Sequence, residues 1–252
     1  LFPYTTLFRS EQGYAEAQNN LGLMYYKGQE VPQDYKEAVK WHRLAAEQGQ
    51  AIAQYNLGLM YYKGQGVPQD YKEAIKWLRL SAKQGDSSAQ QSLGFIYFKG
   101  EGVLKDYSKA FKWSKLGAEQ GDSSAQAILG VMYITARGVR QDYVLGHMWI
   151  NLSASTGYKG AKDMKIKLEK EMTPSQIEKA QEMARNWKPG ERIRTAESPP
   201  TSIPQPPKSK NIAIATGTGF LFGSQDYIIT NYHVVKGTSE VTVKFTNGES
   251  IN

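Results

Sequence analysis

One histidine, His233, lies where an imidazole could do chemistry. It belongs to Thr230-Asn231-Tyr232-His233-Val234-Val235, at the end of an apolar stretch predicted to be a strand, and follows Gly219 by 14 residues. An imidazole ionises near neutral pH, so it can accept a proton and return it during a reaction. A histidine at a strand end can also be a hydrogen-bonded structural residue. The residue type and its position leave both interpretations open.

Two flanking motifs favour the catalytic interpretation. Gly217-x-Gly219-Phe220 followed by Thr230-x-x-His233-Val234-Val235 resembles the start of trypsin-like serine peptidases, especially the bacterial high-temperature-requirement type. The resemblance covers about residues 212–252 and implies the N-terminal part of a trypsin-like barrel. It also implies that His233 is the general base, which takes the proton of a serine hydroxyl and returns it to the leaving amine.

The other two members of such a triad are missing from the sequence. The family order is His, Asp and then Ser in a Gly-x-Ser-Gly turn, but no Asp follows His233. Ser239 and Ser250 lack the glycines that would expose a nucleophile and form an oxyanion hole. We therefore expect the chain as given to be inactive and its intact parent to be a serine endopeptidase. The alternative is a non-catalytic adaptor with a pseudo-protease β domain.

Other candidate sites are weaker, and we expect no cofactor and no metal. His42 and His147 have no second metal ligand at helical spacing. The Gly217-x-Gly219-x-x-x-Gly223 pattern differs from the dinucleotide-binding motif. The net charge is +7, but the basic residues are dispersed, so we expect no nucleic-acid partner. No stretch has the roughly 18 consecutive apolar residues of a membrane span.

The segments around His233 predict a small all-β part. Alternating apolar residues predict strands over 216–222, 227–235 and 240–245, separated by glycine-containing turns. Before them, residues 189–211 are rich in proline, serine and lysine, which is typical of an extended or flexible linker.

The larger part of the chain is an internal repeat with a period of 36 residues. Many positions recur at this step, including a leucine, a glycine, an aspartate and a tryptophan, and such self-similarity indicates a stack of repeated units. The recurring residues include Leu21, Leu57, Leu93 and Leu129; Gly22, Gly58, Gly94 and Gly130; Asp34, Asp70, Asp106 and Asp142; and Trp41, Trp77, Trp113 and Trp149.

Each unit is predicted to be a helical hairpin. Ala17, Leu21, Met24 and Tyr25 form one face of a first helix, and Gly28 is predicted to end it. Gly22 lies off that face, where a missing side chain would let a neighbouring helix approach. Asp34 is predicted to cap the second helix, whose apolar face is expected to carry Ala38, Trp41, Leu44 and Ala45. Because neither helix can bury its apolar face alone, the units must stack.

The repeat resembles the Sel-one-like family, a tetratricopeptide-related α/α solenoid. The matching strings are Ala53-Gln54-x-x-Leu57-Gly58-x-Met60-Tyr61, Gly64-x-Gly66-Val67-x-Gln69-Asp70-Tyr71, Ala74-x-x-Trp77 and Ala82-x-Gln84-Gly85. The resemblance implies a scaffold that binds a protein or peptide through the solenoid groove, with Tyr26 and Tyr62 expected to line it. In the fourth unit Ala136, Arg140 and Gly146 replace the usual residues, which suggests an end unit.

These observations give four regions. Residues 1–10 match a translated sequencing adapter and are interpreted as an artefact. Residues 11–188 are predicted to be the solenoid, closed by a capping helix from Thr173 to about Trp187. Residues 189–211 are the linker, and residues 212–252 the incomplete peptidase domain. The repeats would recruit a partner or substrate to the peptidase. The peptidase resemblance leans towards the bacterial envelope or periplasm, while oligomeric state stays open.

Overall fold

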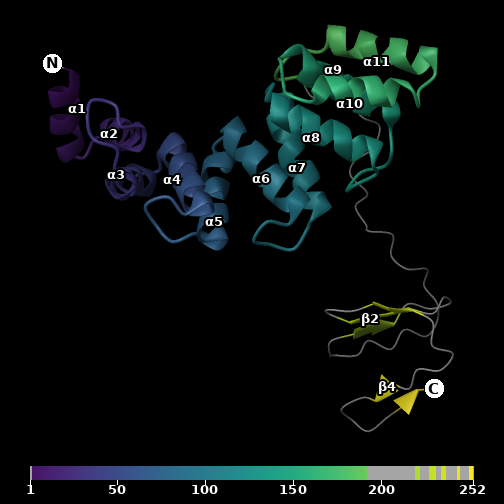
Figure 1. Ribbon diagram of the computed structural model, residues 1–252, viewed down its shortest axis with the longest axis horizontal. Helices are drawn as coiled ribbons and strands as arrows, with labels where there is room; N and C mark the ends of the chain where they lie inside the picture. The colour runs from purple at the N-terminus through teal and green to yellow at the C-terminus, as the bar shows by residue number, and fades with distance from the viewer. Residues whose placement is uncertain are drawn as a thin grey trace. The chain divides into compact units, whose positions relative to one another are not determined.

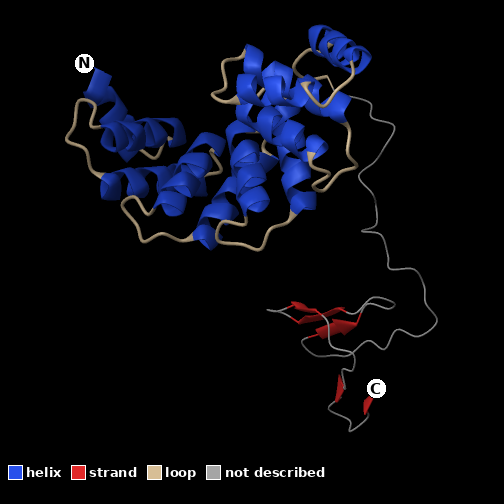
Figure 2. Ribbon diagram, turned by 45° about the vertical axis from the view of Figure 1, so that its right-hand side comes forward, coloured by secondary structure: helices blue, strands red, loops and turns tan. Residues whose placement is uncertain are grey.

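A computed structural model describes residues 2–191 and the short segments 219–221, 227–230, 234–236, 243–244 and 250–251, with side chains over 6–191. The chain divides into two compact units, Leu1–Pro199 and Pro200–Asn252. The described part of the first unit is entirely helical, and that of the second contains only strands (Figure 2).

The first unit is a stack of helical hairpins, as predicted. The helices follow one another in chain order along the stack (Figure 1), and the two helices of one hairpin pack closely together. The four full repeats are α2/α3, α4/α5, α6/α7 and α8/α9. The helix bounds are α1 Phe2–Glu11, α2 Ala15–Lys27, α3 Tyr35–Glu47, α4 Ala51–Lys63, α5 Tyr71–Lys83, α6 Ser87–Lys99, α7 Tyr107–Glu119, α8 Ser123–Ile134, α9 Tyr143–Ser155, α10 Ala161–Glu169 and α11 Pro174–Asn186.

Local sequence signals set the helix ends. The Asp34 carboxylate accepts hydrogen bonds from the backbone N–H groups of Lys36 and Glu37, at 2.8 and 3.1 Å, and so caps α3. Asp70 caps α5 in the same way. The first helices of three repeats end at Gly28, Gly64 and Gly100 in the left-handed conformation. These predictions are confirmed.

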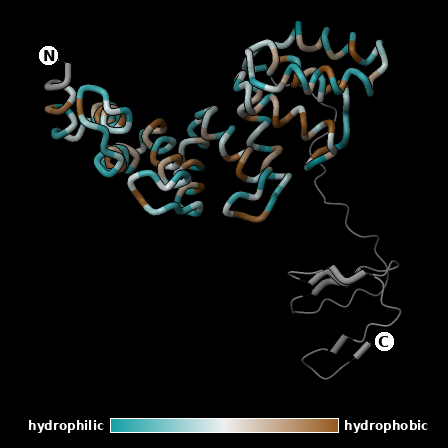
Figure 3. Tube along the Cα trace, in the orientation of Figure 1, coloured by the Kyte–Doolittle hydropathy of each residue, from teal (hydrophilic) through white to brown (hydrophobic). Residues whose placement is uncertain are grey.

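The glycine inside each first helix allows close contact within the hairpin, as expected. A Cβ atom on Gly58 would lie 2.9 Å from Leu78 Cγ, and one on Gly130 would lie 2.7 Å from Ile150 Cγ1. Both distances are too short for carbon atoms, so only glycine lets the second helix approach this far. The core is therefore distributed along the stack, and Figure 3 shows hydrophobic residues recurring from helix to helix.

The predicted apolar face of the second helix was partly wrong. Ala38, Val39 and Ala45 are buried, but Leu44 is 39% exposed and Trp41 is only half-buried. The reason is that two partners, the first helix of the same repeat and that of the next, pack on this helix from different sides. They cover a stripe shifted by one residue from the predicted one, and Trp41 and Leu44 lie at its edge.

The fourth repeat is not an end unit with relaxed packing, as its sequence drift suggested. A Cβ atom on Gly146 would lie 2.7 Å from Ile134 Cγ1, so Gly146 accommodates a neighbour in α8. The repeat is followed by two further helices, α10 and α11, which both pack on α9.

Ala136 in that repeat keeps the left-handed conformation of the glycines it replaces, with φ of 54°. The left-handed conformation costs an L-residue about 1–2 kcal/mol. Glycine avoids this cost, but it loses more conformational freedom on folding, which cancels part of the gain in stability. Because Ala136 is exposed and buries no methyl group, we expect Ala136→Gly to raise the free energy of unfolding by about 0.5–1 kcal/mol. Urea denaturation followed by circular dichroism measures this, and a loss of stability would contradict the strain.

The end of the stack is closed by α11. Thr173 and Gln176 form a capping box with Pro174 at the first helical position, as predicted. Ala180 and Ala184 are buried against the stack. Trp187, just after the helix, meets Trp149 edge to face with ring centroids 5.5 Å apart.

The N-terminal residues are helical as well. Ser10 takes the register of Ala46, and its carbonyl accepts a hydrogen bond from Gln18 Nε2 at 3.1 Å, as the Ala46 carbonyl does from Gln54. Helix α1 thus occupies the place of a second helix of a preceding repeat. The interpretation of residues 1–10 as an adapter translation concerns their origin and stays a prediction.

The described strands of the second unit pair in two small antiparallel sheets. One contains β1 Gly219–Leu221, β2 Tyr227–Thr230 and β3 Val234–Lys236, and the other β4 Val243–Lys244 and β5 Ser250–Ile251. The single strand predicted over 227–235 was wrong, because Ile229 pairs with Val234 across two antiparallel strands. Asn231, a residue type that favours turns, lies in the sequence between the two strands.

No helix in the described ranges is long and apolar enough to cross a membrane.

Candidate protein-binding surface

The second helices of the first three repeats carry a series of incompletely buried apolar side chains. Trp41, Trp77 and Trp113 are half-buried at the same register of α3, α5 and α7. Leu44 and Leu80, three residues after the first two tryptophans, are each 39% exposed. We call these five residues the tryptophan row. Their fourth equivalent, Trp149, is only 2% exposed, so among the described residues the row differs from it in being less covered.

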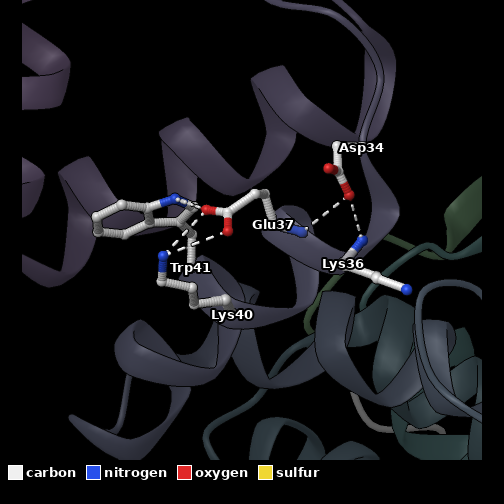
Figure 4. Close-up of polar contacts among 5 residues, drawn as sticks. All are labelled: Asp34, Lys36, Glu37, Lys40 and Trp41. Carbon is white, nitrogen blue, oxygen red and sulfur yellow. Dashed lines mark hydrogen bonds and ion pairs between the residues drawn. The ribbon is translucent and has the colours of Figure 1, made fainter.

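A polar frame fixes the first tryptophan (Figure 4). Glu37 Oε2 accepts a hydrogen bond from Trp41 Nε1 at 3.2 Å and forms an ion pair with Lys40 Nζ at 3.2 Å. The Lys40 ammonium also lies 5.3 Å from the Trp41 ring centroid. Asp34 caps the start of the same helix. The cap, the ion pair between Glu37 and Lys40 and the Trp41 indole therefore all belong to the N-terminal part of α3. The Trp41 ring is therefore held by contacts within its own helix.

The frame repeats with a change of charge. In α5, Glu73 pairs with Lys76 at 3.0 Å, and Lys76 lies 5.3 Å from the centroid of Trp77. In α7, Lys112 lies 5.7 Å from the Trp113 centroid, but Lys109 stands where the glutamates were. The surface around the row therefore becomes more basic towards the third repeat.

A ladder of glutamines, in which Gln54 and Gln90 are buried and Gln84 and Gln120 are exposed, holds successive repeats in register. Gln54 Nε2 donates to the Ala46 carbonyl at 3.1 Å, and its Oε1 accepts from Gln84 Nε2 at 2.8 Å. Gln90 makes the equivalent bonds to Ala82 and Gln120, at 3.1 and 2.7 Å. Gln54 and Gln84 belong to the strings that resemble the family, but their pattern alone predicted no such role. The glutamines recurring every 36 residues were the available signal.

The two tyrosines expected to line a groove make hydrogen bonds to the next repeat. Tyr26 Oη donates a hydrogen bond to Gln65 Oε1 at 3.1 Å, and Tyr62 Oη donates to Glu101. Each bond reaches the loop of the next repeat, so both tyrosines tie neighbouring repeats together. Burial and the Glu101 carboxylate raise the pKa of Tyr62 to about 12.

The histidines of the stack are buried structural residues and lie in different repeats. His42 is 1% exposed, and its Nδ1 lies 3.1 Å from Asn19 Oδ1, which also accepts from Asn56 Nδ2. His147 is fully buried, with Nε2 2.9 Å from Glu169 Oε1. Within the described ranges, no three His, Cys, Asp or Glu side chains gather as a metal site would require.

His42 should make the stability of the stack depend on pH. Burial lowers its pKa to about 4, from 6.5. The neutral form is therefore favoured by folding, so stability is complete above pH 6.5 and is lost as pH falls towards 4. Between pH 7.5 and 5 the loss should be about 2 kcal/mol.

The matched variant is His42→Leu, because Leu78 fills the same register in the next repeat. Urea denaturation at both pH values should show a smaller pH difference in this variant than in the natural chain. An unchanged difference would show that other groups cause it.

His233, the candidate general base, lies outside the described residues, between β2 and β3 in the sequence.

Comparison with known proteins agrees with this architecture. The family model described as Sel1 repeat matches residues 15–50, 51–86, 87–122 and 123–158. The chain belongs to the Sel1 repeat family. A crystal structure of a Sel1 repeat protein from Oxalobacter formigenes is similar, with 38% identity over 71% of this chain and 76% of that chain, and a TM-score of 0.62. The matched segments correspond to the four repeats from α2 to α9.

Two further similarities cover less of the compared proteins. A protective antigen of uropathogenic Escherichia coli with an SLR fold is 29% identical over 70% of this chain and 46% of that chain, with a TM-score of 0.46. An uncharacterized protein of Sinorhizobium fredii, y4bJ, is 42% identical over 57 residues. That match covers 23% of this chain, and the chain spans only 9% of that protein.

The solenoid is thus a Sel1 repeat scaffold, of the type that typically mediates protein–protein interaction.

Proposed function

We propose that the stack binds a protein partner on the side that bears the tryptophan row. The observation that carries this proposal is the half-burial of tryptophan at one register of three successive second helices. Buried tryptophans are among the side chains that contribute most to protein interfaces, because they remove a large apolar area from water while few torsions are fixed. The glutamine ladder keeps the three rings at a fixed spacing, so a rigid partner can meet all of them.

A photo-crosslinking residue at position 44 of the full chain tests this proposal in its source cells. Leu44 lies beside Trp41, whereas Leu104, in the loop before α7, is 91% exposed and lies outside the row. We expect a discrete crosslinked protein from position 44 that is absent from position 104. Equal crosslinking from both positions, or none from position 44, would contradict the proposal.

We further propose that the intact protein joins this scaffold to a trypsin-like serine peptidase. The support is the sequence resemblance of residues 212–252, with His233 as general base, and the antiparallel pairing of β1, β2 and β3 is compatible with it. The segment over 189–211 would keep a captured protein at high local concentration near the peptidase. The repeats would then select the substrate or an adaptor for it.

The gene sequence beyond the codon of Asn252 gives the first test. An Asp followed by Gly-x-Ser-Gly is expected, and a complete β domain without that serine would favour the non-catalytic adaptor. In a full-length protein with the triad, His233→Ala should abolish cleavage of casein and leave crosslinking from position 44 intact. Retained cleavage would refute the role of His233.

A further inference from the structure

The capping segment shows how a helix covers a tryptophan of this register. Helix α11 packs on α9 and buries Ala180 and Ala184, while Trp187 covers Trp149 edge to face. The chain then continues to α7, where the Gly190 N–H donates a hydrogen bond to the Glu119 carbonyl at 2.7 Å. An amphipathic helix with a tryptophan at its end thus occupies the second-helix side of the stack.

The first three repeats lack such a cover among the described residues. Trp41, Trp77 and Trp113 share the register of Trp149 and remain half-exposed, with Leu44 and Leu80 beside them. Trp77 and Trp113 still pack against the hydrophobic core with part of their side chains, and Trp149 belongs to the core. The row therefore continues a surface that already takes a helix in the fourth repeat.

The charges beside the row indicate what kind of helix would fit. A lysine precedes each tryptophan, and a second cation follows two residues after it: Lys40, Lys76, Lys112, Arg43, Arg79 and Lys115. Glu37 and Glu73 pair with the lysine in the first two repeats. In the third, Lys115 lies 3.8 Å from Glu119, and among the described residues Lys112 has no such ion pair. A partner with acidic residues on the flanks of its apolar face would pair with these cations, and a basic one would be repelled.

We propose that the tryptophan row binds an acidic amphipathic helix of another protein, which lies across the second helices of repeats one to three as α11 lies on α9. This inference rests on the proposed scaffold function and specifies its partner. The apolar face of the helix would contact Trp41, Trp77 and Trp113, and its carboxylates would reach the flanking lysines and arginines. Specificity would come from charge, and most of the affinity from the tryptophans.

Two matched peptides probe the proposal. Both are residues 172–191 of this chain with blocked ends and a fluorescent label. The acidic peptide carries Lys179→Glu, Arg185→Glu and Lys188→Glu, and the basic peptide carries Glu178→Lys, Glu182→Lys and Glu191→Lys. Their buried-face residues are identical, so only charge differs. Fluorescence anisotropy with the full chain should show binding of the acidic peptide that is at least about tenfold tighter than that of the basic peptide.

Variants of the full chain then locate the site. Trp41→Ala combined with Trp77→Ala should weaken binding of the acidic peptide at least about tenfold, while Leu104→Ala leaves it unchanged. Lys76→Glu combined with Lys112→Glu should lower affinity for the acidic peptide and raise it for the basic one. This reversal depends on surface charge and not on folding, which circular dichroism checks for each variant.

Equal binding of the two peptides, or no saturable binding below about 1 mM, would overturn the proposal. Concentration-dependent dimerisation that Trp77→Ala abolishes would also overturn it, because a second copy would then cover the row. If position 44 crosslinks a partner but the acidic peptide does not bind, the scaffold function stands and the acidic-helix proposal fails. If position 44 crosslinks no partner and the acidic peptide does not bind, the scaffold function and the acidic-helix proposal both fail.

Discussion

Replacing Gly66 with alanine is expected to lower the free energy of unfolding by about 2–4 kcal/mol. Gly66 has φ of 73°, and a Cβ atom there would overlap the backbone carbonyl of Tyr35 in the preceding repeat. An alanine would lower the free energy of unfolding in two ways, through the strained left-handed conformation and through the clash with this carbonyl. Backbone atoms cannot rotate away as a side chain can, so the two repeats would have to separate. Urea denaturation of the full chain followed by circular dichroism measures the loss.

The chain offers a matched control in its first repeat. Glu30 occupies the register of Gly66 and already has φ of 63°, but it is exposed. Glu30→Ala should therefore change the free energy of unfolding by less than about 0.5 kcal/mol. Similar losses in the two variants would contradict the contact between repeats as the source of the cost.

The second large effect is expected from Gln90→Leu, which should cost about 1–3 kcal/mol. Gln90 is 4% exposed, donates to the Ala82 carbonyl and accepts from Gln120 Nε2. Leucine has nearly the same size but makes neither bond, so the buried Ala82 carbonyl loses one of its donors, while the exposed Gln120 remains hydrated. Buried polar groups that lose a partner pay the full cost of desolvation. Because the bond from Gln90 to Ala82 joins repeats two and three, the transition should also become less cooperative.

Gln126 provides the comparison. It donates to the Ala118 carbonyl at 3.3 Å, but among the described residues its Oε1 accepts no hydrogen bond. The register of Gln120 is filled by Thr156 in the next repeat. Gln126→Leu should therefore cost about half as much as Gln90→Leu, and Thr156→Gln should add about 1 kcal/mol by supplying the missing donor. A loss from Gln126→Leu as large as that from Gln90→Leu would refute the ladder as the source of the effect.

These two effects bear on function because they concern the spacing between repeats. Gly66 and Gln90 lie outside the tryptophan row, yet each sets how closely one hairpin approaches the next. A weakened contact would change the distance between Trp41 and Trp77, or between Trp77 and Trp113. Binding of a rigid helix to all three should therefore fall in parallel with stability.

Local signals in the sequence predicted much of the fold. The step of 36 residues revealed the repeats, and Asp34 and Gly28 marked helix ends, because caps depend on hydrogen bonds within a few residues. The glycine at position 22 and its equivalents predicted close helix contact for a similar reason: a missing side chain can be seen in the sequence itself. The proposed role of His233 also depends on sequence alone.

The tertiary structure decided which of several equivalent residues are covered. Trp41 and Trp149 have the same register, yet α11 packs beside only the second, and the position of α11 depends on the tertiary structure. The buried stripe of α3 was likewise shifted because two neighbouring helices cover it from different sides. Gly66 and Gln90 take their importance from backbone carbonyls of the preceding repeat, those of Tyr35 and Ala82. Such effects depend on how hairpins approach each other, which is set by packing over the whole stack.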